Sequence, residues 1–169
     1  MGPRDLGALV SWLRSLPPVD RELPESSVGP VGRLLFLAGE FPLLSAELID
    51  HEDRTFFQPE EGVTREFGRY VASSCVGCHG TAYAGGRIPG TPPDWPDAAN
   101  LTPHAESPFA SWTKDDFRRL ADTGRWPDGR ELNRTYMPWH AIGAMTETEF
   151  EALWLFLQSL EPRPTGARD

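Results

Sequence analysis

Cysteine, lysine and long apolar runs are all scarce in this chain of 169 residues. Only two cysteines are present, and Lys114 is the only lysine, a bias that we attribute to genome composition and not to mechanism. No run of about twenty apolar residues occurs, so the sequence predicts no transmembrane helix. The first residues also lack the order of basic, apolar and small residues that marks a signal peptide.

The charge balance is acidic, with a formal net charge of −9 and a sequence pI near 4.9. This balance argues against nucleic acid or an anionic membrane surface as a partner, because both carry negative charge. It allows docking to a basic patch on a protein, although an acidic surface also serves solubility. The chain has 17 prolines and 16 glycines, which predicts that much of it is loop.

Both cysteines fall in one motif, Cys75-Val76-Gly77-Cys78-His79, which has the form CxxCH. This motif is typical of covalent attachment of a c-type haem. Two thiols add to the two vinyl groups of the porphyrin, and the histidine that follows is carried under the ring, where it binds iron. The small Gly77 lets the backbone lie close to the macrocycle. We therefore predict one haem c, bound through Cys75 and Cys78 with His79 as the proximal ligand.

Two other interpretations of the CxxC pair stay open at this point. A thioredoxin-like dithiol would need a βαβ setting, and none is visible near the motif. A zinc site needs four ligands, and no second Cys or Cys/His pair follows at a suitable spacing.

The second axial ligand of the iron is predicted to be Met137, in the sequence Tyr136-Met137-Pro138-Trp139. The proline biases Met137 away from helical backbone, so its side chain projects from an extended loop. A thioether is a soft, neutral ligand that raises the reduction potential relative to a second histidine. Met145 is a weaker candidate because it adjoins the last helix, where a core role is expected. His140 and His104 remain candidates for a second histidine ligand.

Other residues are candidates for supporting roles around the haem. The carbonyl of Pro89 is a candidate acceptor for the second N–H of the proximal imidazole, because such bonds are common around metal-binding histidines. Pro89 could equally be a loop proline without this role. Residues expected to pack against the ring are Trp112, Trp139, Tyr83 and Leu101. Candidate partners for the propionates are Arg87, Arg125 and Arg130, although a surface role is the favoured interpretation for any one of them.

The helices expected from apolar spacing and capping signals lie at both ends and in the middle of the chain. Asp5 to Leu16 has apolar residues at helical spacing, and Thr64 to Ser73 leads directly into Cys75. A threonine N-cap and acidic first turn open a helix at Thr113, and Gly124 ends it. A capping box at Thr146 to Glu149 opens a last helix that runs to Leu160. The prediction is an all-α domain of three main helices with long loops around one haem.

The first and last of these segments resemble each other. Asp5 to Pro18 aligns without a gap with Glu149 to Pro162. Two unrelated amphipathic helices could match by chance. An internal repeat is the sharper interpretation, and it leads us to expect an earlier domain, and the export signal, upstream of Met1.

The sequence therefore divides into four expected parts. Residues 1–18 form a helix that resembles the end of a preceding haem domain. Residues 19–61 form a Pro-rich linker with two short apolar runs, Val31 to Gly39 and Phe41 to Ile49. Residues 62–162 form the haem domain, and residues 163–169 form a disordered tail.

The ordered set of motifs resembles the class I cytochrome c family. The motifs are CVGCH at 75–79, NLTP at 100–103, WT at 112–113, DF at 116–117, DGR at 128–130, MPW at 137–139 and ALWLFL at 152–157. They are similar, more narrowly, to domains in the cytochrome subunits of membrane-bound alcohol and gluconate dehydrogenases. The resemblance covers roughly residues 62–162. The run at 106–111 lacks the glycine-rich sequence usual in those subunits.

The resemblance implies a class I cytochrome c fold with His79 and Met137 as axial ligands. It also implies that the helix around Gly68 and Tyr70 packs against the last helix near Trp154 and Phe156. The implied role is a periplasmic protein, or one at the outer face of the cytoplasmic membrane, that passes electrons toward a respiratory chain.

The expected function is single-electron transfer without catalysis by this chain. Partners would be a dehydrogenase, an oxidase or another cytochrome, and the chain could be the cytochrome subunit or domain of a dehydrogenase. The alternative is a haem enzyme or gas sensor with an open distal site, of the peroxidase sort, which requires that Met137 does not bind iron.

Overall fold

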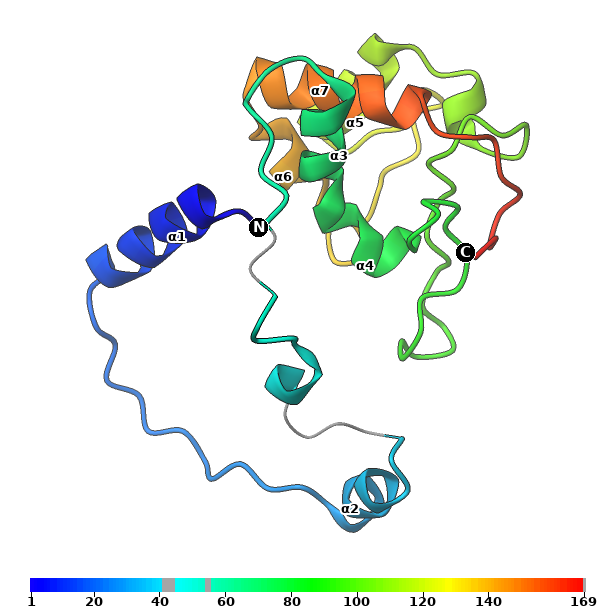
Figure 1. The fold of residues 1–169 in the computed structure, drawn as a ribbon. Coiled ribbons are helices and arrows are strands. Elements are labelled where there is room, and N and C mark those ends of the chain that lie inside the picture. Colours follow the sequence, from blue (N-terminus) through cyan, green and yellow to red (C-terminus); the bar gives the residue numbers. More distant parts are fainter. Residues whose placement is uncertain (41–44, 54–55, 169) are drawn as a thin grey trace. The chain divides into compact units, whose positions relative to one another are not determined.

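The computed structural model describes residues 1–40, 45–53 and 56–168, in two compact units that divide between Phe57 and Gln58 (Figure 1). Across these described ranges the regular structure is helical, and the only β pairing is two isolated bridges, Gly86 with Ala98 and Arg125 with Glu131. The all-α fold expected from the sequence is confirmed.

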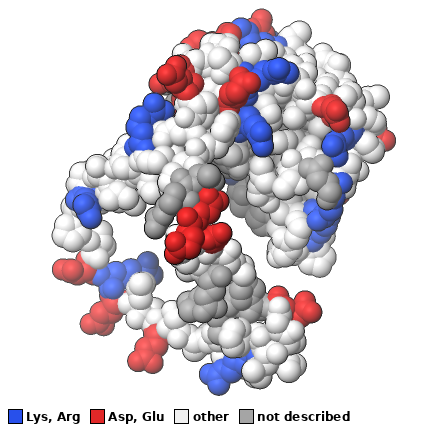
Figure 2. All heavy atoms as spheres, viewed as in Figure 1, with Lys and Arg blue, Asp and Glu red and all other residues white. Residues whose placement is uncertain are grey.

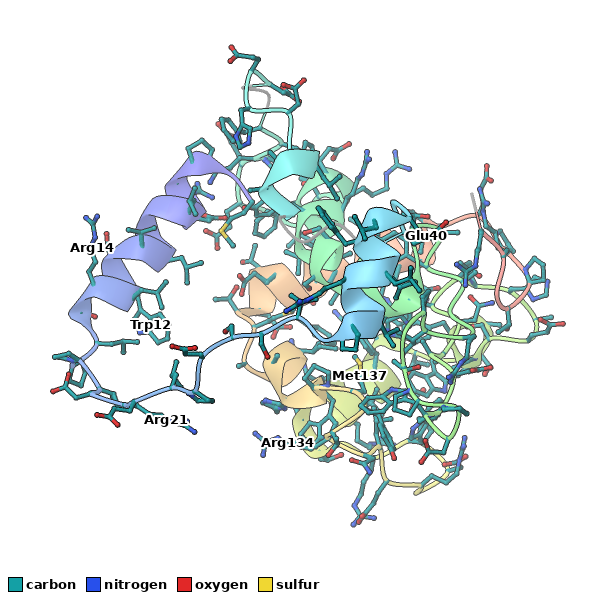
Figure 3. All side chains as sticks on the ribbon, turned by 90° about the horizontal axis from the view of Figure 1, so that it is seen from below. Trp12, Arg14, Arg21, Glu40, Arg134 and Met137 are labelled. Atoms are coloured by element: carbon teal, nitrogen blue, oxygen red, sulfur yellow. The ribbon has the colours of Figure 1, made fainter. Side chains whose placement is uncertain are left out.

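The first unit carries α1 (Pro3–Ser15), α2 (Pro30–Leu37) and the short 3-10 helix η1 (Ser45–Leu48). Neither α1 nor α2 has a buried residue. Trp12 and Arg14 project from different sides of α1 (Figure 3), and Leu9, Trp12 and Leu13 are all more than a third exposed. The apolar run that begins at Phe41 lies partly outside the described residues.

The second unit contains the CxxCH motif, and its main helices are α3 (Arg65–Ala72), α5 (Lys114–Thr123) and α7 (Glu147–Gln158). Shorter elements lie between them: η2 (Ser73–Cys75), α4 (Val76–His79), η3 (Pro108–Ala110) and α6 (Trp139–Gly143). The sequence pattern predicts the three main helices but not α6, whose five residues are too short to show a helical period.

The start of each main helix follows from a threonine at its N-cap. The hydroxyl of Thr64 accepts a hydrogen bond from the backbone N–H of Phe67. Thr113 and Thr146 each form a reciprocal capping box, with Asp116 and Glu149 as the acidic partners. Such caps satisfy backbone N–H groups that have no partner inside the helix. The box at Thr146 is as the sequence predicts.

The packing of α3 on α7 builds the centre of the domain (Figure 1). Gly68 allows the close approach, because a Cβ atom at this position would lie 2.0 Å from the carbonyl oxygen of Ala152 and 2.7 Å from the Cβ of Phe156. The predicted contact of the Gly68 helix with the last helix is therefore confirmed. Aromatic side chains extend this core, with Phe117 stacked on both Phe150 and Trp154.

Residues 163–168, which the sequence predicts to be a disordered tail, are hydrogen-bonded to the rest of the second unit. The side chain of the buried Asn100 donates to the carbonyl of Arg163 and accepts from the backbone and hydroxyl of the buried Thr102. The backbone N–H of Gly166 donates to the carbonyl of Ala84. Two buried polar side chains thus use the start of this segment to satisfy their hydrogen-bonding groups.

The face of the molecule drawn in Figure 2 carries both acidic and basic side chains. Among the described residues, no helix combines the length and the apolar character that a membrane crossing requires.

Candidate functional site

The CxxCH motif lies on a short helical segment at the end of α3. The chain passes through η2 into α4, which ends at His79, and Gly80 leaves the helical path with a φ of 76°. Cys75 and Cys78 are three residues apart in this segment, so their side chains lie on the same side of it. Both cysteines are free thiols, with Cys75 partly buried and Cys78 exposed. Burial raises the pKa of the Cys75 thiol, the Ser74 hydroxyl opposes this shift, and Cys78 adds to it.

His79 is buried, with 6% of its surface exposed, and its Nδ1 lies 2.7 Å from the carbonyl oxygen of Ala99. Because a carbonyl only accepts, Nδ1 carries the proton, and the lone pair of Nε2 is left for a metal. Burial lowers the pKa of the imidazole, and the hydrogen bond to Ala99 opposes this shift. The side chain thus has the tautomer of an iron ligand.

The prediction that the carbonyl of Pro89 accepts the hydrogen bond from His79 is wrong, because the acceptor is the carbonyl of Ala99. The loop after His79 folds back on itself, and paired backbone hydrogen bonds of 2.8 and 2.9 Å join Gly86 to Ala98. This bridge brings Ala99 beside the imidazole. Two residues twenty positions apart come together only through this fold-back, so neither composition nor local spacing could identify the acceptor.

A cavity of about 440 Å³ opens beside His79, a size in the range of small-molecule and cofactor sites. Its walls are mainly apolar and aromatic. They include Ile88, Trp95, Leu101, Phe109, Trp112, Phe117, Leu120, Trp126, Leu132, Tyr136 and Met137, with Cys78 and His79 on the same lining and Asp97, Arg130, Glu131 and Asn133 as polar members.

Met137 lines this cavity with His79, and Figure 3 labels it in the segment between α5 and α6. A tight turn holds it in place: the carbonyl of Asn133 accepts from the backbone N–H groups of Tyr136 and Met137. The side chain of Asn133 accepts from the N–H of Thr135. The sequence predicts the projecting methionine but not the asparagine that forms its turn.

The other candidate ligands do not line the cavity. Met145 packs against the hydrophobic core. The Nδ1 of His140 accepts a hydrogen bond of 3.1 Å from Arg134. His104 lies 3.8 Å from the carboxylate of Glu106.

Of the residues expected to pack on the ring, Leu101 and Trp112 line the cavity, whereas Tyr83 and Trp139 do not. Tyr83 packs edge-on against Phe156 in the core. Trp139 lies against Gly124, where a Cβ atom would come within 2.4 Å of its ring. Its Nε1 is buried and has no hydrogen-bond partner among the described residues.

Of the arginines proposed for the propionates, Arg130 alone lines this cavity, with its guanidinium 4.6 Å from the ring centre of Trp126. Arg125 is paired with Glu131. Arg87 donates to three backbone carbonyls, those of Thr91, Pro92 and Trp95.

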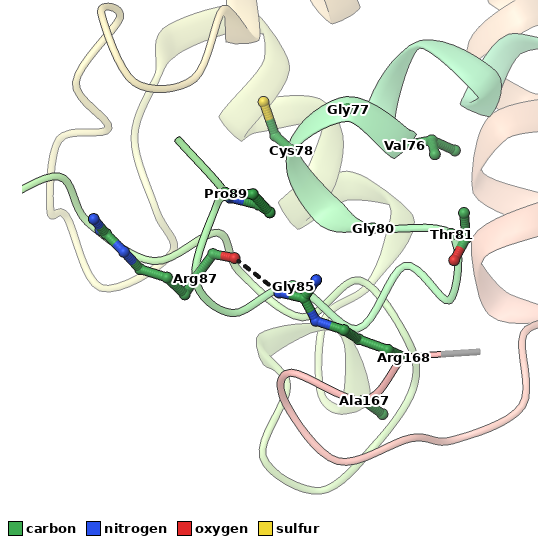
Figure 4. A pocket seen from close by; sticks show the side chains of 10 residues that line it. All are labelled: Val76, Gly77, Cys78, Gly80, Thr81, Gly85, Arg87, Pro89, Ala167 and Arg168. Atoms are coloured by element: carbon green, nitrogen blue, oxygen red, sulfur yellow. Dashed lines mark hydrogen bonds between the residues drawn. The ribbon is translucent and has the colours of Figure 1, made fainter. Parts of the chain in front are cut away.

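A second hollow, of about 340 Å³, lies on the other border of the motif (Figure 4). It is lined by Val76, Gly77, Cys78, Gly80, Thr81, Gly85, Arg87, Pro89, Ala167 and Arg168, and Arg168 donates to the carbonyl of Arg87 at 3.5 Å. Cys78 borders both hollows.

The residues fit a covalently held haem. They supply two thiols on one side of a helical turn, a neutral imidazole with Nε2 available, a thioether, and an apolar cavity lined by Cys78, His79 and Met137. They do not fit the rival zinc site, because the described ranges contain no group of three or more His, Cys, Asp or Glu side chains able to hold a metal ion.

A family model described as "Cytochrome c" matches residues 68–161, a range that contains the CxxCH motif, Met137 and α3 from Gly68 onward. No curated protein matches the chain.

Proposed function

The chain belongs to the cytochrome c family, and from this membership we propose that it carries single electrons through one haem whose axial ligands are His79 and Met137. When bound, haem supplies a one-electron couple at its iron. Cys75 and Cys78 would hold the ring through thioether bonds. His79, fixed by Ala99, presents Nε2, and Met137 presents a soft neutral sulfur on the facing loop. The apolar walls would limit the access of water to His79 and Met137.

The observation that carries the ligand assignment is the shared lining. Met137 and His79 face one cavity, whereas Met145, His140 and His104 do not line it. A loop methionine that faces the proximal histidine is suited to complete the ligand set of an electron carrier, in which no position is left open for a substrate.

The test is an absorption spectrum of the matured holoprotein. We expect a sharp reduced α-band and, in the oxidised protein, the weak near-infrared band of a Met–Fe(III) bond. Met137→Ala should abolish the near-infrared band. Met145→Ala, the matched control, should keep it and lose only stability. An unchanged spectrum in Met137→Ala would exclude Met137 as a ligand, and a spectrum typical of an open distal site in the wild type would favour a haem enzyme or gas sensor.

We further propose that the redox partner is a dehydrogenase complex on the outer side of the cytoplasmic membrane, with this chain as its cytochrome component. The support is the resemblance of the ordered motifs between 75 and 157 to those of dehydrogenase cytochrome subunits, together with the normal attachment of haem c outside the cytoplasm. Affinity purification from the native host tests this. Recovery of a flavin-dependent or quinone-cofactor-dependent subunit would support it, and recovery of an oxidase alone would contradict it.

Residues 1–18 are proposed to carry the counterpart of α7 from a second haem domain. Two observations support this proposal: α1 and α7 begin at corresponding positions of the alignment, and they differ in how far their corresponding leucines are buried. Gly2 and Thr146, the N-caps of α1 and α7, correspond in the gap-free alignment. Leu9 and Leu13 of α1 are 38% and 52% exposed, whereas their counterparts in α7, Leu153 and Leu157, are each 1% exposed.

A further inference from the structure

Two loops meet at the cavity through an aromatic pair. Trp95 belongs to the loop that follows His79, and Tyr136 belongs to the turn that carries Met137. Their ring centres are 4.7 Å apart and their planes cross at 69°. Both residues line the haem cavity. An edge-to-face contact of this kind is attractive beyond the area that it buries, so the pair ties the His79 side of the cavity to the Met137 side.

Arg87 holds the backbone behind Trp95. Its guanidinium donates to the carbonyls of Trp95 at 2.9 Å, Thr91 at 2.8 Å and Pro92 at 2.7 Å. A planar guanidinium has several donors in a fixed fork and can hold three carbonyls at once, which an ammonium group on a flexible stem does less well. The loop from 87 to 95 is therefore closed around one side chain, and Trp95 is presented from a fixed backbone.

Tyr136 and Met137 belong to the same turn. Both of their backbone N–H groups donate to the carbonyl of Asn133, each at 3.1 Å. A contact that restrains the ring of Tyr136 therefore also restrains the turn that presents the sulfur of Met137.

We propose that Arg87, Trp95 and Tyr136 form a clasp that keeps Met137 at the iron. The three are positioning residues, since none of them is a ligand. The proposal rests on the ligand assignment above and adds a reason why the bond to Met137 persists. Loss of the clasp should raise the fraction of time in which the turn moves away and the distal position of the iron is open.

Competition with imidazole measures that fraction. Imidazole binds ferric haem only when the methionine has left, so its apparent affinity rises with the open population. We expect Tyr136→Leu and Trp95→Leu each to bind imidazole roughly three- to tenfold more tightly than wild type, the loss expected for one aromatic pair. The double variant should gain little beyond either single variant, because both remove the same contact.

Conservative variants of Tyr136 and Arg87 distinguish loss of a specific contact from a general loss of packing. Tyr136→Phe keeps the ring and should keep the wild-type affinity for imidazole. Arg87→Gln should tighten imidazole binding, and Arg87→Lys should restore the wild-type value only in part. Tyr70→Leu is the control: it removes an aromatic ring from α3 that stacks on Phe67 and does not line the cavity. It should lower the melting temperature and leave imidazole affinity unchanged.

Unchanged imidazole affinity in both Tyr136→Leu and Trp95→Leu would overturn the clasp, and so would an equal gain in Tyr70→Leu. These failures are distinct from failure of the ligand assignment. In the first two cases the wild type shows the near-infrared band and Met137→Ala abolishes it. If the ligand assignment fails, Met137→Ala leaves the spectrum unchanged.

Discussion

At the scale of single residues, the buried polar pair Asn100 and Thr102 joins distant parts of the haem domain. The Asn100 amide donates to the Arg163 carbonyl, and its oxygen accepts from Thr102. Both side chains are almost fully buried, so water cannot replace these bonds. The NLTP motif at 100–103 thus has a structural role, in fastening the segment after α7.

We expect Asn100→Ala to lower the free energy of unfolding by about 1–3 kcal/mol, because it leaves the backbone N–H of the buried Thr102 without its acceptor and leaves only the Thr102 hydroxyl to bond the Arg163 carbonyl. Denaturant titration followed by tryptophan fluorescence measures the change. Ser111→Ala, at an exposed position, is the control and should change the free energy by less than about 0.5 kcal/mol. A loss in Asn100→Ala no larger than the control's would contradict the role.

Single residues also show where prediction from sequence ends. The two thiols, His79 and Met137 can be named from motifs, because their chemistry is local in sequence. The Ala99 acceptor cannot, since a backbone carbonyl carries no residue signature and reaches His79 only through the Gly86 to Ala98 bridge. Tyr83 and Trp139 look like ring-packing aromatics, yet tertiary packing uses them elsewhere.

At the scale of helices, the crossing of α3 and α7 depends on one missing side chain. Gly68→Ala would place a methyl 2.0 Å from the Ala152 carbonyl oxygen, so the helices must separate. We expect a loss of about 1–3 kcal/mol in unfolding free energy, as for an overpacked core. Chemical denaturation of the holoprotein tests this.

Gly62→Ala is the matched control, because its Cβ would meet only the methyl of Thr64 at 3.9 Å. Equal stability of the two variants would show that the crossing tolerates a wider spacing than the structure has.

The likeness of α1 to α7 can be tested by grafting. We expect a chain in which Pro3–Arg14 replaces Glu147–Gln158 to attach haem and keep the Met–Fe(III) band with reduced stability, because the aligned apolar face can pack on α3. The same graft with serine at the positions of Leu9 and Leu13 should fail to fold and should lack the Met–Fe(III) band. If the two grafted chains have the same spectrum and the same stability, the apolar face of α1 does not pack on α3 as that of α7 does.

Helices were the most predictable level of this structure. The starts of α5 and α7 follow from Thr113 and Thr146, whose capping signals are local. The sequence pattern does not predict the short α6, because five residues are too few to show a helical repeat of apolar positions. The loops that build the cavity from 80 to 100 and from 125 to 138 have little regular structure, so their paths depend on contacts such as Trp95 with Tyr136 that sequence spacing does not show.

At the scale of the whole molecule, the buried apolar core lies within the haem unit. Its described members run from Phe67 to Leu157, and none comes from residues 1–57. We therefore expect a chain of residues 58–169 to attach haem and to show the spectrum of the full chain. Its melting temperature should differ by less than about 4 °C, the shift that corresponds to about 1 kcal/mol in a domain of this size.

The measurements are absorption spectroscopy and thermal unfolding of the two purified proteins side by side. If residues 58–169 fail to attach haem, or if their melting temperature is much lower, the first unit contributes to the folding or stability of the haem domain. In that case the division between Phe57 and Gln58 would not be a folding boundary.

The hydrogen bond between His79 and Ala99 has an electrical consequence. A carbonyl that accepts a hydrogen bond from Nδ1–H makes the imidazole a more basic ligand, and a more basic ligand favours ferric over ferrous iron. The loop that folds back to place Ala99 beside His79 thereby contributes to the reduction potential of the haem. A small change in the distance between the Ala99 carbonyl oxygen and His79 Nδ1 would shift that reduction potential, although the iron ligands stay the same.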